Sequence, residues 1–212
     1  GIRNNMGDQK RMGDRSNGIR LYISQAEAVM REIDSRGTCF SRREYVALKY
    51  GESREIFLTA YDWFVKELQK RVKRPAGAQY PYWGYREEYG IDWSGENVGF
   101  QAEVPADQLV LFDADDWRKI LCMQYIGEDE GEERAFRDEL SQMGIREEQA
   151  VLTGFYPDIK RRIMESWDRL FVNDRRFKNG EESSRGGIQA GMWEIKREWI
   201  VKIGEKKEKM LD

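Results

Sequence analysis

The chain of 212 residues contains no histidine at all. Catalysis by serine–histidine–aspartate or cysteine–histidine groups needs an imidazole base, so the composition excludes both of these enzyme classes. Metal centres with imidazole ligands are excluded for the same reason, and a transition metal would need a site made of carboxylates. We therefore expect no metal cofactor.

Cysteine is also scarce, since Cys39 and Cys122 lie far apart and no pair has metal-binding spacing. Two thiols in a chain of this length are typical of a reducing compartment. Three arginines close in sequence to Cys39 would lower the pKa of its thiol if they faced it, and a buried structural thiol is the alternative that we prefer. Because no apolar run approaches the roughly 20 residues of a membrane span, we expect a cytoplasmic protein with no membrane partner.

Charge is unevenly distributed, although the net charge is only −3. Residues 1–74 carry 16 Lys and Arg against 10 Asp and Glu, whereas residues 75–150 carry 6 against 18. A nucleic-acid-binding domain is usually basic overall. We therefore do not expect nucleic acid as a partner, and we interpret most charged runs as solvated helix faces.

Apolar periodicity predicts several amphipathic helices. Ser24 with Glu27 and Ser41 with Glu44 have the spacing of capping boxes, in which a serine oxygen and a glutamate satisfy the first backbone amides of a helix. Asp113 is expected to cap a further helix, because an acidic side chain suits the first turn. The expected helices cover residues 24–37, 41–51, 52–73 and 132–143, the segment after Asp113, and a segment that starts at Pro157.

Strands are expected to be short. Residues 98–104 alternate apolar and polar side chains, and residues 109–112 are continuously apolar, as in a strand that is buried on both faces. The other expected strands are residues 20–23 and an element within 188–203 that is either one bent strand or a hairpin-like pair. Segments without a clear period are expected to be loops, namely 75–97, 127–133 and 173–187.

These elements predict an α+β fold, with a mixed α/β arrangement as the alternative. Several amphipathic helices would surround a small sheet in one compact domain that spans residues 20–204. The polar residues 1–19 are expected to form a disordered leader, and the charged residues 205–212 a frayed tail.

Aromatic residues make up 12% of the chain and lie in short segments with polar neighbours. Within residues 80–85, three aromatic side chains would offer flat faces for stacking a base or a nicotinamide ring. The alternative is a loop that its own aromatic side chains hold against the core. The candidate ligand-binding residues are Arg20, Tyr61, Asp62, Arg71, Tyr82, Trp83 and Tyr85.

These segments also carry a family resemblance, whose motifs are Tyr61-Asp62-Trp63, Arg71, Pro81-Tyr82-Trp83, Glu103-Val104-Pro105, Leu111, Asp113, Trp117, Ser166-Trp167, Phe171, Ile188-Gln189-Ala190 and Trp193-Glu194. In their order and spacing, roughly over residues 20–203, the chain resembles the uncharacterised bacterial family catalogued as domain of unknown function 3841. It departs from that family at Phe112-Asp113-Ala114, where the family tends to have Ser-Asp-Phe, and at Tyr22-Ile23, where it tends to have Trp-Thr. The resemblance implies no activity.

Two functions remain open, and the sequence does not decide whether the protein is an enzyme. The first is a non-catalytic ligand-binding or partner-binding regulatory module for an unidentified small molecule or protein. The second is a nucleotide-handling enzyme with an ADP-ribosyltransferase-like fold that acts on NAD as its cofactor or substrate. Arg20 would then hold a phosphate or ribose, Tyr82 or Trp83 would stack on nicotinamide, and Gln189 or Glu194 would be the polar catalytic group.

Overall fold

The computed structural model describes residues 18–183 and 185–205, with the backbone alone for residues 45–48. The fold is mixed α+β, as predicted. Its main sheet is antiparallel throughout and has the strand order β5-β6-β3-β1-β4-β8. The strands are β1 (Gly18–Ala26), β3 (Tyr82–Tyr85), β4 (Asn97–Pro105), β5 (Leu109–Asp113), β6 (Ile188–Met192) and β8 (Ile200–Ile203).

A second, two-stranded sheet is formed by β2 (Thr38–Phe40) and β7 (Glu194–Lys196). The segment 188–203 therefore contributes three separate strands, and the prediction of one bent strand or a hairpin-like pair is wrong. β6 pairs with β3 and β5, β7 pairs with β2, and β8 pairs with β4. The error has a physical cause, because three strands of three to five residues look alike in sequence and only their distant partners separate them.

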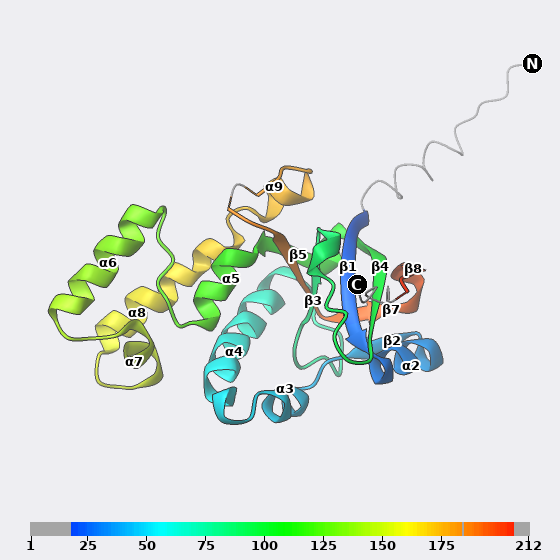
Figure 1. The fold of residues 1–212 in the computed structure, drawn as a ribbon, viewed down its shortest axis with the longest axis horizontal. Coiled ribbons are helices and arrows are strands. Elements are labelled where there is room, and N and C mark those ends of the chain that lie inside the picture. Colours follow the sequence, from blue (N-terminus) through cyan, green and yellow to red (C-terminus); the bar gives the residue numbers. More distant parts are fainter. Residues whose placement is uncertain (1–17, 184, 206–212) are drawn as a thin grey trace, which may run out of the picture.

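The helices gather mainly on one side of the main sheet (Figure 1). Helix α4 lies between the sheet and α5, and α6, α7 and α8 form the end of the molecule farthest from β1 and β4 (Figure 1). The helices are α2 (Glu27–Arg36), α3 (Arg43–Tyr50), α4 (Arg54–Arg71), α5 (Ala114–Leu121), α6 (Glu130–Gln142), α7 (Glu147–Leu152), α8 (Pro157–Ser166) and α9 (Asp174–Lys178). Short 3-10 helices are η1 (Gly51–Ser53), η2 (Glu88–Gly90), η3 (Ala106–Gln108), η4 (Trp167–Phe171) and η5 (Arg197–Trp199).

Alternation along the strands places apolar side chains on both faces of the sheet. Leu21 and Ile23 of β1, with Leu109 and Leu111 of β5, belong to one buried cluster. Phe112, one residue further along β5, belongs to a second cluster that includes the apolar faces of α4, α5 and α8. The prediction that residues 109–112 are buried on both faces is therefore confirmed.

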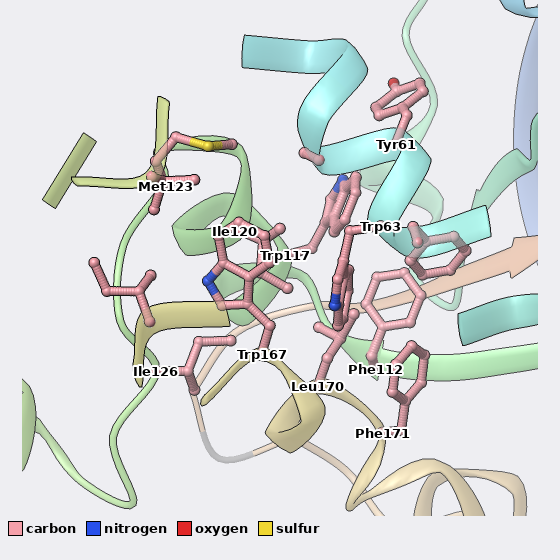
Figure 2. Packing of buried hydrophobic residues seen from close by; sticks show 14 of the residues in the cluster. Tyr61, Trp63, Phe112, Trp117, Ile120, Met123, Ile126, Trp167, Leu170 and Phe171 are labelled. Carbon is pink, nitrogen blue, oxygen red and sulfur yellow. The ribbon is translucent and has the colours of Figure 1, made fainter. Parts of the chain in front are cut away.

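Aromatic side chains join the helices into the second cluster (Figure 2). The Trp63 ring of α4 lies 5.5 Å from that of Trp167, edge to face, and 5.8 Å from that of Phe171, stacked. Trp167 is fully buried, and its indole Nε1 donates to the carbonyl oxygen of Gln124 at 2.8 Å. The segments around Trp63 and Trp167 therefore help to build the core.

The three predicted helix caps are not formed. Ser24 lies within β1, opposite Gly99 of β4, so its hydroxyl cannot cap the helix that begins three residues later. Ser41 pairs with Tyr80 through an isolated bridge, and α3 begins at Arg43 without a side-chain cap. The Asp113 carboxylate accepts hydrogen bonds from Ser183 and Asn173 instead of the first turn of α5.

All three predicted loops contain regular structure. Residues 75–97 include β3, and residues 173–187 include α9, which are too short to show a period in sequence. The acidic segment 127–133 includes the first turn of α6, where Glu132 pairs with Arg169 at 3.1 Å and Glu133 pairs with Lys119 at 2.8 Å. These tertiary ion pairs hold a segment whose charge alone indicated a solvated loop.

The predicted leader and tail lie mostly outside the described residues. Residues 1–17 and 206–212 are not described, while residues 18 and 19 are already part of β1 and do not belong to a leader. Within the described ranges, no helix combines the length and the apolar character that a membrane span requires.

Candidate functional site

Strand register places two predicted site residues, Tyr85 of β3 and Gln189 of β6, in one row. This row lies on the face of the sheet that packs against α4 and α5. Tyr22 of β1 lies opposite Tyr85 of β3, Tyr85 lies opposite Gln189 of β6, and Gln189 lies opposite Phe112 of β5. Cross-strand partners share a face, with about 5 Å between neighbouring strands. Tyr85 and Gln189 are therefore direct neighbours, although 103 residues separate them in the sequence.

Aromatic rings continue this row toward the helices. Trp83 lies two residues before Tyr85 and so points to the same face of β3. Its ring lies 5.4 Å from that of Tyr61 and 4.9 Å from that of Trp117, and its indole Nε1 donates to Tyr61 Oη at 3.2 Å. The Tyr50 hydroxyl is 3.5 Å from that of Tyr61. We call Tyr22, Tyr50, Tyr61, Trp83, Tyr85 and Gln189 the sheet-face site.

The tyrosines of this site are neutral hydrogen-bonding groups. Burial raises the pKa of Tyr61 far above its usual range, and the hydrogen bond with Tyr50 raises it further. Burial also raises the pKa of Tyr85, with smaller effects from the nearby Tyr50 and Asp92. A phenol that keeps its proton can donate or accept a hydrogen bond but is a weak nucleophile.

Gln189 is the polar group at the centre of the row. The residue is only 4% exposed, and its carboxamide makes no hydrogen bond within the part of the chain that the structure describes. In that same part, Asp116 Oδ1 is the fully enclosed side-chain oxygen or nitrogen that lacks a partner. The Gln189 amide must therefore reach accessible space, where a bound molecule can meet both its N–H donors and its carbonyl acceptor.

Arg20 lies on the same face of the sheet, at its margin. It is two residues from Tyr22 on β1, which places its Cα about 12 Å from that of Gln189 on standard strand spacing. Its guanidinium donates to Glu103 at 2.6 Å and to Gln101 at 2.8 Å, and the side chain is 44% exposed. The structure thus brings Arg20, Tyr61, Trp83, Tyr85 and Gln189 onto one face.

The other three candidate ligand-binding residues lie elsewhere. Tyr82 points to the opposite face of β3, where its hydroxyl is 2.9 Å from Cys39 Sγ. Asp62 accepts from Tyr80 Oη at 2.5 Å and pairs with Arg43 at 3.3 Å. Arg71, the last residue of α4, pairs with Glu67 at 3.0 Å and lies 3.9 Å from the centre of the Phe171 ring.

The two candidate catalytic residues do not meet either. Gln189 lies in the main sheet, whereas Glu194 lies on β7 in the two-stranded sheet. Glu194 is 8% exposed and accepts a hydrogen bond from Thr38 Oγ1 at 2.7 Å. The arrangement therefore separates these two residues into different sites.

Sequence reasoning did not mark Tyr22 or Tyr50 as site residues. The alternation of Arg20 and Tyr22 with buried residues along β1 was a usable signal for Tyr22. Asp116 is 6% exposed, and its Oδ1 lies 3.5 Å from Lys119 Nζ and 3.8 Å from an Arg185 nitrogen. Burial raises the pKa of the Asp116 carboxyl, and Lys119 partly offsets this effect.

The fold defines a mixed α+β protein with an antiparallel six-stranded sheet and an aromatic site on one face. The family model for a domain of unknown function (DUF3841) matches residues 20–201, and the chain belongs to this family. No curated protein and no solved structure matches the chain. The family match covers the main sheet except for the first two residues of β1 and the last two residues of β8.

Proposed function

We propose that the protein is a non-catalytic binding module whose sheet-face site holds a small molecule with a flat, polar heterocyclic ring. The observation that carries this proposal is the Gln189 carboxamide, which has no hydrogen-bond partner among the described residues and lies directly beside Tyr85. A nucleotide or nucleobase is the chemical class that fits it best, because such a ring has both a π-face and an edge of donors and acceptors.

Ring stacking and hydrogen bonding to Gln189 are the two contacts that the site offers to such a ligand. Stacking of a base on an aromatic side chain contributes about 1–3 kcal/mol. A site built to hydrogen-bond a polar edge also discriminates strongly, since a ligand that covers Gln189 but lacks this edge leaves its amide unpaired. Half-buried Trp83 and Tyr85 provide the ring surface, and Gln189 provides the selectivity.

The chemistry of the site favours binding over catalysis. A carboxamide does not titrate, and burial keeps the Tyr61 and Tyr85 phenols protonated. Of the two candidate catalytic residues, only Glu194 has a carboxylate that can accept a proton, and it lies in the other sheet.

An NAD-consuming enzyme is the second candidate, and one observation favours it. Arg20, Tyr85 and Gln189 share a face, which matches the roles of phosphate anchor, stacking ring and polar group. In this version Gln189 acts at the ribose, and Glu194 has no part.

A thermal-shift screen against nucleobases, nucleotides, nucleotide sugars and NAD tests both candidates. A ligand at 100 times its Kd adds about 2.7 kcal/mol, which raises the Tm of a chain of this size by roughly 5–10 °C. We expect Gln189→Met to abolish the shift, because methionine keeps the volume but lacks the amide, and we expect the exposed control Gln142→Met to retain it.

Two results would contradict the proposal: no shift with any ring-bearing ligand, or an undiminished shift in Gln189→Met. Chromatography of the NAD samples separates the candidates, since the binding module returns NAD intact and the enzyme releases nicotinamide. Loss of that release in Gln189→Met, with retention in Glu194→Gln, would favour the enzyme.

We also propose that the protein works in the cytoplasm, with no nucleic-acid or membrane partner. Both cysteines are free thiols, Cys39 buried and Cys122 exposed, which suits a reducing compartment.

A further inference from the structure

A pocket of about 400 Å³ lies where the end of α2 meets the two-stranded sheet and η5. It shares no residue with the sheet-face site. Arg36 and Gly37 contribute one wall, Thr38 and Glu194 the adjoining strands, and Lys196, Arg197 and Glu198 the other side. A volume of this size suits a small molecule.

Backbone contacts hold the pocket open in one shape. Arg197 donates its backbone N–H to the Gly37 carbonyl oxygen at 2.9 Å, and its guanidinium donates to the Asp34 carbonyl oxygen at 2.7 Å. These two bonds tie η5 to the last turn of α2. The walls are therefore preorganised, which lowers the entropic cost of binding.

The deepest charge in this pocket is the Glu194 carboxylate. The residue is 92% buried, and Thr38 Oγ1 donates to its Oε2 at 2.7 Å. Its Oε1 is 3.8 Å from Lys196 Nζ, which is too long for a hydrogen bond. A carboxylate can accept about four hydrogen bonds, so Glu194 keeps unused acceptor capacity toward the pocket.

A cationic group suits this position for two reasons. A buried carboxylate is stabilised when an ammonium group replaces the hydration that burial removed. The pocket also lies at the carboxyl end of α2, where the helix dipole is negative and attracts a cation.

The rim of the pocket carries more positive than negative charge, since Arg36, Lys196 and Arg197 are cationic and Glu198 is the anionic residue among them. Arg36 and Lys196 have side chains that are 72% and 39% exposed, and the ion-pair contacts of Arg36 with Glu32 and of Lys196 with Glu194 are long, at 3.6 and 3.8 Å. Both cations can therefore turn toward an anionic group at the pocket mouth. A simple anion would be repelled by Glu194, and a simple cation by the rim.

We propose that this pocket binds a small zwitterion, whose ammonium group pairs with Glu194 and Thr38 and whose carboxylate pairs with Lys196 and Arg36. Amino acids and ω-amino acids have this chemistry. The site is independent of the sheet-face site, so failure of one proposal does not affect the other.

Isothermal titration of the full chain with glycine, β-alanine, 4-aminobutyrate and 6-aminohexanoate tests the proposal, because this series varies the distance between the two charges. We expect at least one member to bind tenfold or more tightly than the alkylamine and the carboxylate of matched length. The absence of any such member would overturn the proposal.

Two variants identify the contacts. Glu194→Gln keeps an acceptor for Thr38 but removes the charge, and we expect it to weaken the zwitterion at least tenfold. Lys196→Met keeps an unbranched side chain beside Trp199 but removes one of the two rim cations, and we expect it to weaken the zwitterion severalfold while the matched alkylamine binds at least as tightly as before. The control Glu130→Gln, exposed at the start of α6, should change neither affinity.

Unchanged zwitterion binding in either variant would contradict the assignment. Circular dichroism and urea unfolding check that each variant is folded. If Glu194→Gln does not fold, the Lys196→Met comparison decides the question by itself.

Discussion

Cys39 shows how tertiary neighbours set the chemistry of one side chain. Three arginines lie close to it in sequence and would lower the pKa of its thiol if they faced it, namely Arg36, Arg42 and Arg43. In the structure its Sγ lies 3.1 Å from Glu32 Oε2 and 2.9 Å from Tyr82 Oη, and the residue is 2% exposed. Burial raises the pKa of the Cys39 thiol to about 11, the Tyr82 hydrogen bond opposes this, and Glu32 adds to it. The structural interpretation of this thiol is the one that the geometry supports.

We therefore expect Cys39 to be nearly inert toward a thiol-reactive disulfide reagent at pH 8. In single-cysteine variants, the exposed Cys122 should react readily with the reagent. Cys39 should react at least 100-fold more slowly, because only the thiolate attacks and this thiol is enclosed. The rate of absorbance change measures both. Equal rates for the two thiols would contradict the burial of Cys39.

The same shift determines how Cys39 affects stability with pH. Its pKa in the folded chain lies above the ordinary thiol value of 9.0, so the unfolded chain releases this proton first as pH rises. The contribution of Cys39 is complete below about pH 9 and is lost progressively toward pH 11. The free energy of unfolding, measured with urea, should therefore fall more steeply between pH 9 and pH 11 in the parent chain than in Cys39→Ala.

At the scale of elements, α9 protects an open sheet edge. β5 is the outer strand of the main sheet, and unpaired backbone groups on such a strand can pair with another chain. Asp174 Oδ1 accepts from the Leu111 backbone N–H at 2.7 Å, and Lys178 Nζ donates to the Leu109 carbonyl oxygen at 2.9 Å. Two side chains, one helical turn apart, thus replace the missing neighbouring strand.

We expect Asp174→Ala to lower the free energy of unfolding by about 1.5–3 kcal/mol, the range for hydrogen bonds to charged groups. The freed Leu111 amide should also promote association between chains. Urea unfolding and light scattering measure the two effects. The exposed neighbour Arg175→Ala is the control and should stay within about 0.5 kcal/mol of the parent. A matching loss in both variants would mean that α9 does not protect β5 in this way.

At the scale of the whole molecule, the main sheet lies between two apolar clusters, and close contact with α4 depends on a glycine. Gly191 of β6 faces the helix layer, and a Cβ at this position would lie 2.6 Å from Phe64 Cζ. Phe64 is fully buried, so its ring has no space into which to move. Gly191 thus allows α4 to pack directly on the sheet, next to Trp83.

We expect Gly191→Ala to destabilise the protein by about 1–3 kcal/mol, the usual cost of overpacking a core. Gly154→Ala is the matched control, because nothing lies within 4 Å of its added Cβ. Urea unfolding midpoints compare the two variants. A Gly191→Ala chain as stable as the control would show that the sheet and α4 can separate at little cost.

Local patterns in the sequence predicted the elements with clear periods. Residues 98–104 and 109–112 were identified as strands, residues 132–143 correspond closely to α6, and Pro157 begins α8 as expected. The same patterns failed at β2, β3 and α9, which have three to five residues. Such short elements are stabilised by their partners and not by a period of their own.

The candidate site shows the same division. The sequence alone was sufficient to exclude imidazole chemistry and to mark Tyr85 and Gln189 as candidates, because residue type determines which reactions a chain can perform. Only the tertiary structure placed these two residues side by side and moved Tyr82 and Glu194 elsewhere, because strand register joins positions that are about 100 residues apart. Residue identity limits the chemistry, and the pairing of distant strands decides which of those residues can act together.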